Sequence, residues 1–143
     1  MEIEKLVKKQ RRFFQTGETL SYQFRMDALN RLSLALEQYE EPLEKALYRD
    51  LHKSKMESYM AEIALTKSEL SYCKKHLAGW MRKEHVKSSL SNFHSGAFTI
   101  AEPYGVTLIM APWNYPVMLC LEPLINAIAA GNCVILKPSA YAP

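Results

Sequence analysis

The sequence contains 143 residues, of which 48% are hydrophobic and 23% are charged, as expected for one modest globular core. A formal net charge of only +3 excludes a nucleic-acid-binding surface, because the 18 basic residues are interleaved with 15 acidic ones. The three cysteines lack CxxC spacing and the four histidines lack metal-ligand spacing, so neither a disulfide framework nor a metal site is expected.

No membrane-spanning or targeting segment is expected either. The longest apolar region is interrupted by Glu122, Pro123 and Asn126, which is untypical of a membrane span. The N-terminus lacks an apolar signal core, and Glu2 and Glu4 count against a transit peptide. Reduced thiols fit a cytoplasmic protein, and the cytoplasm is the localisation that we expect.

Residues 1–84 are expected to be helical. A first helix from Glu2 to Thr16 is ended by Gly17, a second begins near Ser21, and Pro42 ends the second and can start a third. The apolar positions expected to face the core are Leu6, Val7, Phe13 and Phe14, then Ala28, Leu32, Ala35, Leu36 and Tyr39, then Leu43, Ala46, Leu47 and Leu51.

A capping box, Ser54 followed by Glu57, opens a long amphipathic stretch. Its apolar positions are Met56, Tyr59, Met60, Ile63, Leu70, Cys73, Leu77, Trp80 and Met81. Whether Thr66 and Lys67 break this stretch stays open.

Residues 85–103 change to an alternating pattern, with turn residues at 92–96 between two runs. The first run contains Val86, Ser88 and Leu90, and the second contains Phe98, Ile100 and Glu102. The pattern predicts a β-hairpin arm, which is marginally stable alone and exposes a strand edge.

Residues 104–143 have the order β-loop-α-β. The short apolar runs Val106–Met110 and Cys133–Leu136 predict buried strands. Val117–Ala130 is apolar nearly all round and predicts a helix buried on every side, with Pro116 in its first turn and Gly131 as its left-handed stop.

Two parallel strands joined by a helical crossover end on the same side of a sheet. Pro112, Trp113 and Asn114 follow the first strand, and Lys137, Pro138 and Ser139 follow the second. We therefore expect both tips at the carboxyl edge, where open α/β sheets bind ligands.

Three motifs occur there in order: A-P-W-N-Y-P at 111–116, A-x-A-A-G-N at 127–132 and K-P-S at 137–139. Together they resemble the aldehyde dehydrogenase superfamily. The early start and FFQTGETLSYQFRMDALNRLSLAL look most like its class-3-like branch with a short N-terminus. The resemblance implies an α/β fold, in which N-terminal helices (1–84) and an oligomerisation arm (85–103) precede the first βαβ unit of a Rossmann-like NAD(P)-binding domain (104–143). That domain is incomplete here, so the chain reads as an N-terminal portion.

Asn114 is the predicted catalytic residue. A side-chain amide offers two uncharged N–H donors, which suit an oxyanion that forms as an aldehyde becomes tetrahedral. By spacing alone, a turn asparagine bonded to its own backbone is favoured. The resemblance reverses that preference, because the family uses this asparagine together with a backbone amide at the catalytic cysteine.

The resemblance implies that the cofactor is NAD or NADP. Lys137 matches a position that contacts the adenosine ribose, although by spacing alone a lysine reaching solvent is equally plausible. The other predicted cofactor-binding residues are Met110, Pro112, Trp113, Ser139 and Ala140. Family members commonly carry a glutamate where this chain has Ala140, and its absence predicts tolerance of NADP.

Cys120 and Cys133 are interpreted as small buried hydrophobic residues. The family's nucleophilic cysteine and general-base glutamate lie beyond the K-P-S motif, so residues 1–143 alone are predicted to be inactive. The complete enzyme is expected to oxidise an aliphatic or aromatic aldehyde to the acid, as a homodimer. The alternatives are an acylating or acyl-phosphate-reducing relative, and a non-catalytic helical interaction or regulatory module with a vestigial nucleotide-binding edge.

Overall fold

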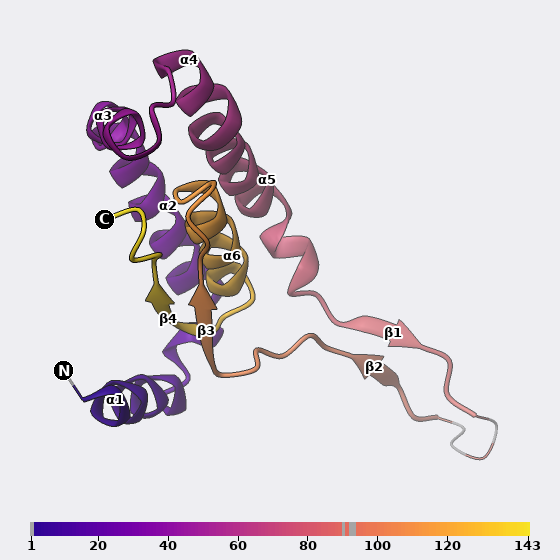
Figure 1. Ribbon diagram of the computed structural model, residues 1–143. Coiled ribbons are helices and arrows are strands. Elements are labelled where there is room, and N and C mark those ends of the chain that lie inside the picture. Colours follow the sequence, from indigo (N-terminus) through magenta and orange to yellow (C-terminus); the bar gives the residue numbers. More distant parts are fainter. Residues whose placement is uncertain (1, 90, 92–93) are drawn as a thin grey trace.

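The computed structural model describes residues 2–89, 91 and 94–143. A body of helices carries a small sheet, and a two-stranded arm extends away from it (Figure 1). The elements are α1 (Ile3–Gln15), η1 (Glu18–Leu20), α2 (Tyr22–Gln38), α3 (Glu40–Leu51), α4 (Lys55–Ser58), η2 (Tyr59–Ile63), α5 (Ala64–Trp80), β1 (Glu84–Val86), β2 (Ala97–Thr99), β3 (Val106–Met110), α6 (Met118–Ala129) and β4 (Cys133–Lys137). This arrangement confirms the predicted α/β fold.

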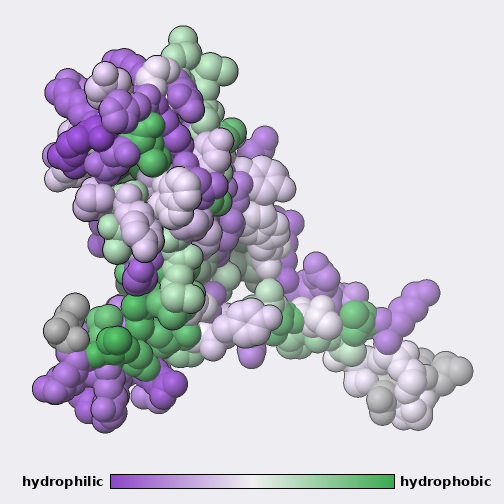
Figure 2. All heavy atoms as spheres, in the orientation of Figure 1, coloured by the Kyte–Doolittle hydropathy of each residue, from purple (hydrophilic) through white to green (hydrophobic). Residues whose placement is uncertain are grey.

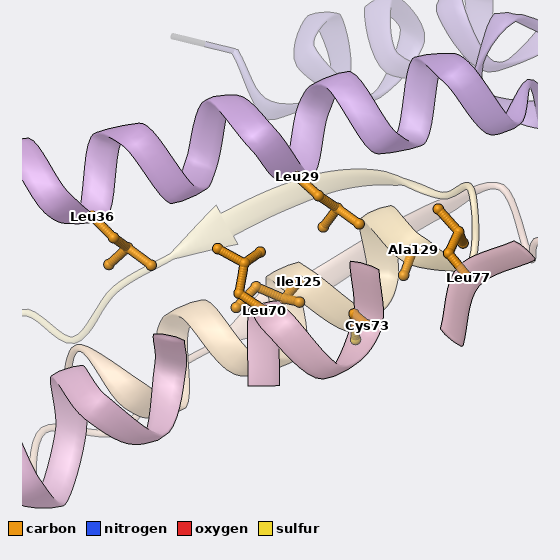
Figure 3. Packing of buried hydrophobic residues seen from close by; sticks show 7 residues of the cluster. All are labelled: Leu29, Leu36, Leu70, Cys73, Leu77, Ile125 and Ala129. Carbon is orange, nitrogen blue, oxygen red and sulfur yellow. The ribbon is translucent and has the colours of Figure 1, made fainter. Parts of the chain in front are cut away.

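The core lies between α2, α5 and α6 (Figure 3). Its buried cluster consists of Leu29, Leu36, Leu70, Cys73, Leu77, Ile125 and Ala129. Burying each large apolar side chain contributes roughly 1.5–3 kcal/mol, so this cluster is a main source of stability. It joins the N-terminal helices to the helix of the βαβ unit.

The βαβ unit is confirmed: β3 and β4 pair in parallel, with α6 between them in the chain. Gly131 ends α6 with φ 88°, as its predicted left-handed stop requires. The side-chain oxygen of Asn132 accepts a hydrogen bond from the Gly105 N–H at 2.9 Å. This bond ties together the residues that precede the two strands.

The hairpin arm is also confirmed, with β1 and β2 antiparallel and His85 opposite Phe98. Its strands are shorter than the alternating pattern, because Ser88, Ile100 and Glu102 lie outside them. Leu90 and residues 92–93 of the predicted turn lie outside the described residues.

The prediction that apolar residues after Ser54 face the core is wrong for Met56, Tyr59 and Met60, whereas Ile63 is buried as predicted. Met56 and Met60 are 67% and 63% exposed, whereas Ser58 and Glu62 are fully buried. The helix contains a π-helical turn, η2, whose extra residue rotates the face that points inward. Thr66 lies within α5 and causes no break.

The prediction that the next helix is buried on every side is wrong as well. Pro123 and Asn126 of α6 are exposed, because α2 and α5 pack on one side and the two strands cover only part of the rest. Pro116 precedes the helix instead of lying in its first turn. Figure 2 shows apolar atoms gathered over β3, β4 and the neighbouring α1. Among the described residues, no helix has the length and apolar character needed to cross a bilayer.

Candidate functional site

The tips of β3 and β4 lie side by side, as the βαβ order predicts. Met110 is the register partner of Lys137, and the Ala111 N–H donates to the Lys137 carbonyl oxygen at 3.1 Å. The loop after β3 and the residues after β4 therefore begin at the same edge of the sheet.

The loop after β3 presents Pro112, Trp113 and Asn114, all of them exposed. Trp113 is 54% exposed, so it is not a core aromatic in this structure. Among the described residues, the Asn114 side-chain amide makes no hydrogen bond, whereas its main-chain oxygen accepts one from Lys53 Nζ at 2.8 Å. A turn asparagine would instead bond its own backbone.

The last residue of β4 and the residues after it offer a cation and a hydroxyl. Lys137 and Ala140 are exposed, and Ser139 is half-buried with its hydroxyl accepting a hydrogen bond from the Tyr141 N–H at 3.1 Å. No carboxylate occurs between Lys137 and Pro143. A flexible ammonium beside a hydroxyl can bind ribose hydroxyls or a phosphate, so the chemistry of this tip fits part of a nucleotide site.

A buried ion pair beneath the loop was missed by sequence reasoning. Lys53 Nζ lies 2.5 Å from Glu62 Oε1, with side-chain exposures of 9% and 0%. The pair contacts both the loop and the start of α6. Charged residues in an amphipathic stretch are usually solvated, so the sequence carried no clear signal of this burial.

The sequence model of the aldehyde dehydrogenase family matches residues 1–143. The chain belongs to the aldehyde dehydrogenase family. Its class 3 relatives include aldehyde dehydrogenase family 3 member I1 of Arabidopsis thaliana, a chloroplastic protein. That relative is 43% identical over 99% of this chain and 26% of its own length. The 4,4'-diaponeurosporen-aldehyde dehydrogenase of Staphylococcus aureus is 44% identical over 92% of this chain and 28% of its own length.

The fold agrees with solved aldehyde dehydrogenase structures. The substrate-bound state of Staphylococcus aureus AldH has a TM-score of 0.94 and 42% identity, over 97% of this chain and 30% of that one. An indole-3-acetaldehyde dehydrogenase of P. syringae in complex with NAD+ has a TM-score of 0.83 and 27% identity, over 96% and 27%. A glyceraldehyde-3-phosphate dehydrogenase of Methanocaldococcus jannaschii with NADP shares the fold at 22% identity and a TM-score of 0.85, over 99% and 30%. The chain thus spans less than a third of the aldehyde dehydrogenases that it matches.

The cysteines of this aldehyde dehydrogenase chain are unsuited to nucleophilic attack. Cys73, Cys120 and Cys133 are free and buried. Burial raises the pKa of the Cys120 and Cys133 thiols, and burial followed by the nearby Glu69 carboxylate raises the pKa of Cys73 to about 11. Because the thiolate is the reactive form, none of them is activated at neutral pH.

Proposed function

We propose that this chain supplies the oxyanion-stabilising amide and part of the NAD(P) site of a class 3 aldehyde dehydrogenase. The supporting observation is at Asn114, which is exposed at the carboxyl edge and has its main chain held by Lys53, while its side-chain amide bonds to none of the residues that the structure describes. As an aldehyde becomes tetrahedral its oxygen gains negative charge, and preorganised neutral N–H donors stabilise that charge.

The proposed cofactor contacts divide between the two strand tips. Lys137, Ser139 and Ala140 lie on the adenosine side, and Met110, Pro112 and Trp113 approach the same cofactor largely through their main chain. Lys137 offers the cation for a ribose hydroxyl or a phosphate. NAD or NADP held by these residues would supply the hydride acceptor for the oxidation.

In the complete enzyme, a cysteine thiolate supplied by another part of the protein attacks the carbonyl carbon of an aliphatic or aromatic aldehyde. The resulting thiohemiacetal oxygen is held by Asn114. Loss of a hydride gives a thioester, and a general-base glutamate, also outside this chain, activates the water that releases the acid. The name of the Staphylococcus aureus relative, which specifies an aldehyde, supports this substrate class.

The hairpin arm is proposed to pair with a second copy of the protein in a homodimer. Its three-residue strands leave unpaired edges, and the apolar side chains of Val86, Phe98 and, just after β2, Ile100 are exposed. The enzyme is also proposed to be cytoplasmic, which the free thiols of Cys73, Cys120 and Cys133 support. Light scattering of the complete protein and of an arm-deleted variant tests the first point, and cell fractionation tests the second.

The reaction is tested by assaying NAD- and NADP-dependent oxidation of aliphatic and aromatic aldehydes by the complete protein. Asn114→Ala is expected to lower kcat by about 10²–10³, or roughly 3–4 kcal/mol, with little change in cofactor affinity. Asn30→Ala, on the exposed side of α2, is the matched control. If kcat is unchanged and cofactor binding is weakened, Asn114 contacts the cofactor and the proposed role at the substrate oxygen is wrong.

A further inference from the structure

Lys53 and Glu62, which form a buried ion pair, both also bind one short segment of the chain, residues 114–118. Lys53 Nζ donates to the main-chain oxygen of Asn114 and lies 3.9 Å from the centre of the Tyr115 ring. The second oxygen of Glu62 accepts from the N–H groups of Val117 at 2.8 Å and Met118 at 3.2 Å. The pair therefore fixes the main chain on both sides of Pro116.

These contacts satisfy the two buried charges. One oxygen of Glu62 accepts from Lys53, and the other binds amides at the start of α6, where the helix dipole favours a negative charge. Lys53 meets a carboxylate, a carbonyl oxygen and the face of an aromatic ring. The pair can therefore stay charged in the interior while it holds the main chain of the loop in place.

Stability alone is a weak reason for such a pair. Desolvating two charges is costly, and apolar side chains of similar volume often stabilise a fold equally well. What the pair supplies is a fixed geometry at Asn114, whose main chain is held while its side-chain amide makes no hydrogen bond within the described part of the chain. Stabilising an oxyanion depends on donors that are placed before charge develops.

We propose that Lys53 and Glu62 are positioning residues that set the Asn114 amide for the oxyanion; this rests on the proposed function of Asn114. They act through the main chain of residues 114–118 and touch neither substrate nor cofactor. Loosening the loop lets the amide leave its place, and a misplacement of about 1 Å can cost about 10²-fold in rate.

The experiment compares Lys53→Met with Asn114→Ala in the complete enzyme. Lys53→Met keeps the length of the side chain but removes its charge and its hydrogen bonds. It is expected to lower kcat about 10- to 100-fold while leaving the dissociation constant of NAD or NADP nearly unchanged. Lys67→Met is the matched control, because Lys67 pairs with Glu40 in a partly buried site away from the loop. It should leave kcat unchanged.

The double variant separates positioning from a general structural role. If Lys53 acts through Asn114, then Lys53→Met costs little further activity once Asn114 is alanine. If Lys53→Met lowers kcat by the same factor in both backgrounds, Lys53 has a structural role only and the proposal is overturned. An unchanged kcat for Lys53→Met alone overturns it as well.

The two proposals fail in distinguishable ways. If Asn114→Ala leaves kcat intact, the proposed function of Asn114 fails and the positioning role fails with it. Suppose that Asn114→Ala has its expected effect, but Lys53→Met either leaves kcat unchanged or lowers it by the same factor with and without Asn114. Only the positioning role of Lys53 then fails. Should Lys53→Met not fold, Glu62→Gln replaces it, since glutamine keeps the volume and one acceptor oxygen. The same loss of kcat and the same non-additivity with Asn114→Ala are expected, and additivity overturns the proposal.

Discussion

Arg25 occupies the space where Gly131 would carry a side chain. A Cβ built on that glycine would lie 2.6 Å from Cζ of Arg25 and 2.8 Å from its Nε. The nearly buried guanidinium donates from Nε to the Thr19 carbonyl oxygen at 2.7 Å and from Nη1 to that of Ala129 at 3.1 Å. Arg25 therefore joins η1 to Ala129 at the end of α6, four residues before β4 begins at Cys133.

Gly131→Ala is predicted to destabilise the enzyme. The glycine has φ 88°, which costs an alanine roughly 1–2 kcal/mol, and the new methyl group would displace a buried guanidinium from its hydrogen bonds, at roughly 1–3 kcal/mol more. We expect a total loss of about 3 kcal/mol, measured by equilibrium unfolding of the complete protein. Gly79→Ala is the control, since a Cβ there would meet nothing within 4 Å apart from its chain neighbours and the backbone of its own helix. A comparable loss at both positions would contradict the role assigned to Arg25.

Ionisation of the buried Cys73 thiol is predicted to lower the stability of the fold at alkaline pH. Its pKa is raised to about 11, mainly by burial, whereas an unfolded chain has a thiol pKa near the ordinary value of 8.5. A raised folded pKa contributes stability that is fully present below the unfolded pKa and is lost as the pH rises through the folded value.

The expected result is a loss of unfolding free energy between about pH 8.5 and 11 that Cys73→Ala lacks. Tyrosines and lysines also titrate in this range, so the difference between the two proteins is the measured quantity. Parallel pH profiles for the two proteins would show that the Cys73 thiol does not resist ionisation in the fold.

A protein confined to residues 1–143 is predicted to show no NAD(P)-dependent aldehyde oxidation. Its three thiols are buried and have raised pKa values, so none can supply a thiolate near neutral pH. Spectrophotometry at 340 nm follows the reduced cofactor, and the complete protein is the positive control. Turnover by residues 1–143 alone would require a nucleophile that this structure does not provide.

Much of this fold could be predicted because the ends of its helices and strands are set by residues that are adjacent in the sequence. Val106–Met110 is short, β-branched and bounded by Gly105 and Pro112, and it forms β3 with the predicted ends. Gly17 and Gly131 both adopt the positive φ expected of a helix stop. Because the crossover order of a βαβ unit fixes strand direction, the neighbouring tips of β3 and β4 could also be predicted.

The interior polar contacts could not be predicted. Lys53 and Glu62 are far from Asn114 in the sequence, and the face that buries Glu62 depends on the π-helical turn η2. Periodicity therefore placed Met56 and Met60 inside, where the structure has Ser58 and Glu62. At the site, the sequence predicted which residues gather at the edge but gave no sign of what holds the loop.

Ala140 is predicted to set the choice of cofactor. A glutamate at this position can accept hydrogen bonds from the adenosine ribose hydroxyls, and its charge repels a 2′-phosphate. Ala140 is exposed, and Lys137 at the end of β4 offers a countercharge, so we expect the natural enzyme to use NADP as well as NAD. The measurement is kcat/KM for both cofactors.

Ala140→Glu should shift the preference toward NAD by roughly 1–3 kcal/mol, the range of a charge-assisted hydrogen bond gained or an unfavourable contact imposed. Ala140→Gln is the matched control, because it adds a hydrogen-bonding group without the charge. A shift with glutamate alone assigns the effect to repulsion of the 2′-phosphate, and equal shifts assign it to hydrogen bonding with the ribose. If the natural enzyme rejects NADP and neither variant changes the ratio, Ala140 does not lie at the ribose. The placement of Lys137 on the cofactor is then wrong too, because both residues were assigned from the same strand tip.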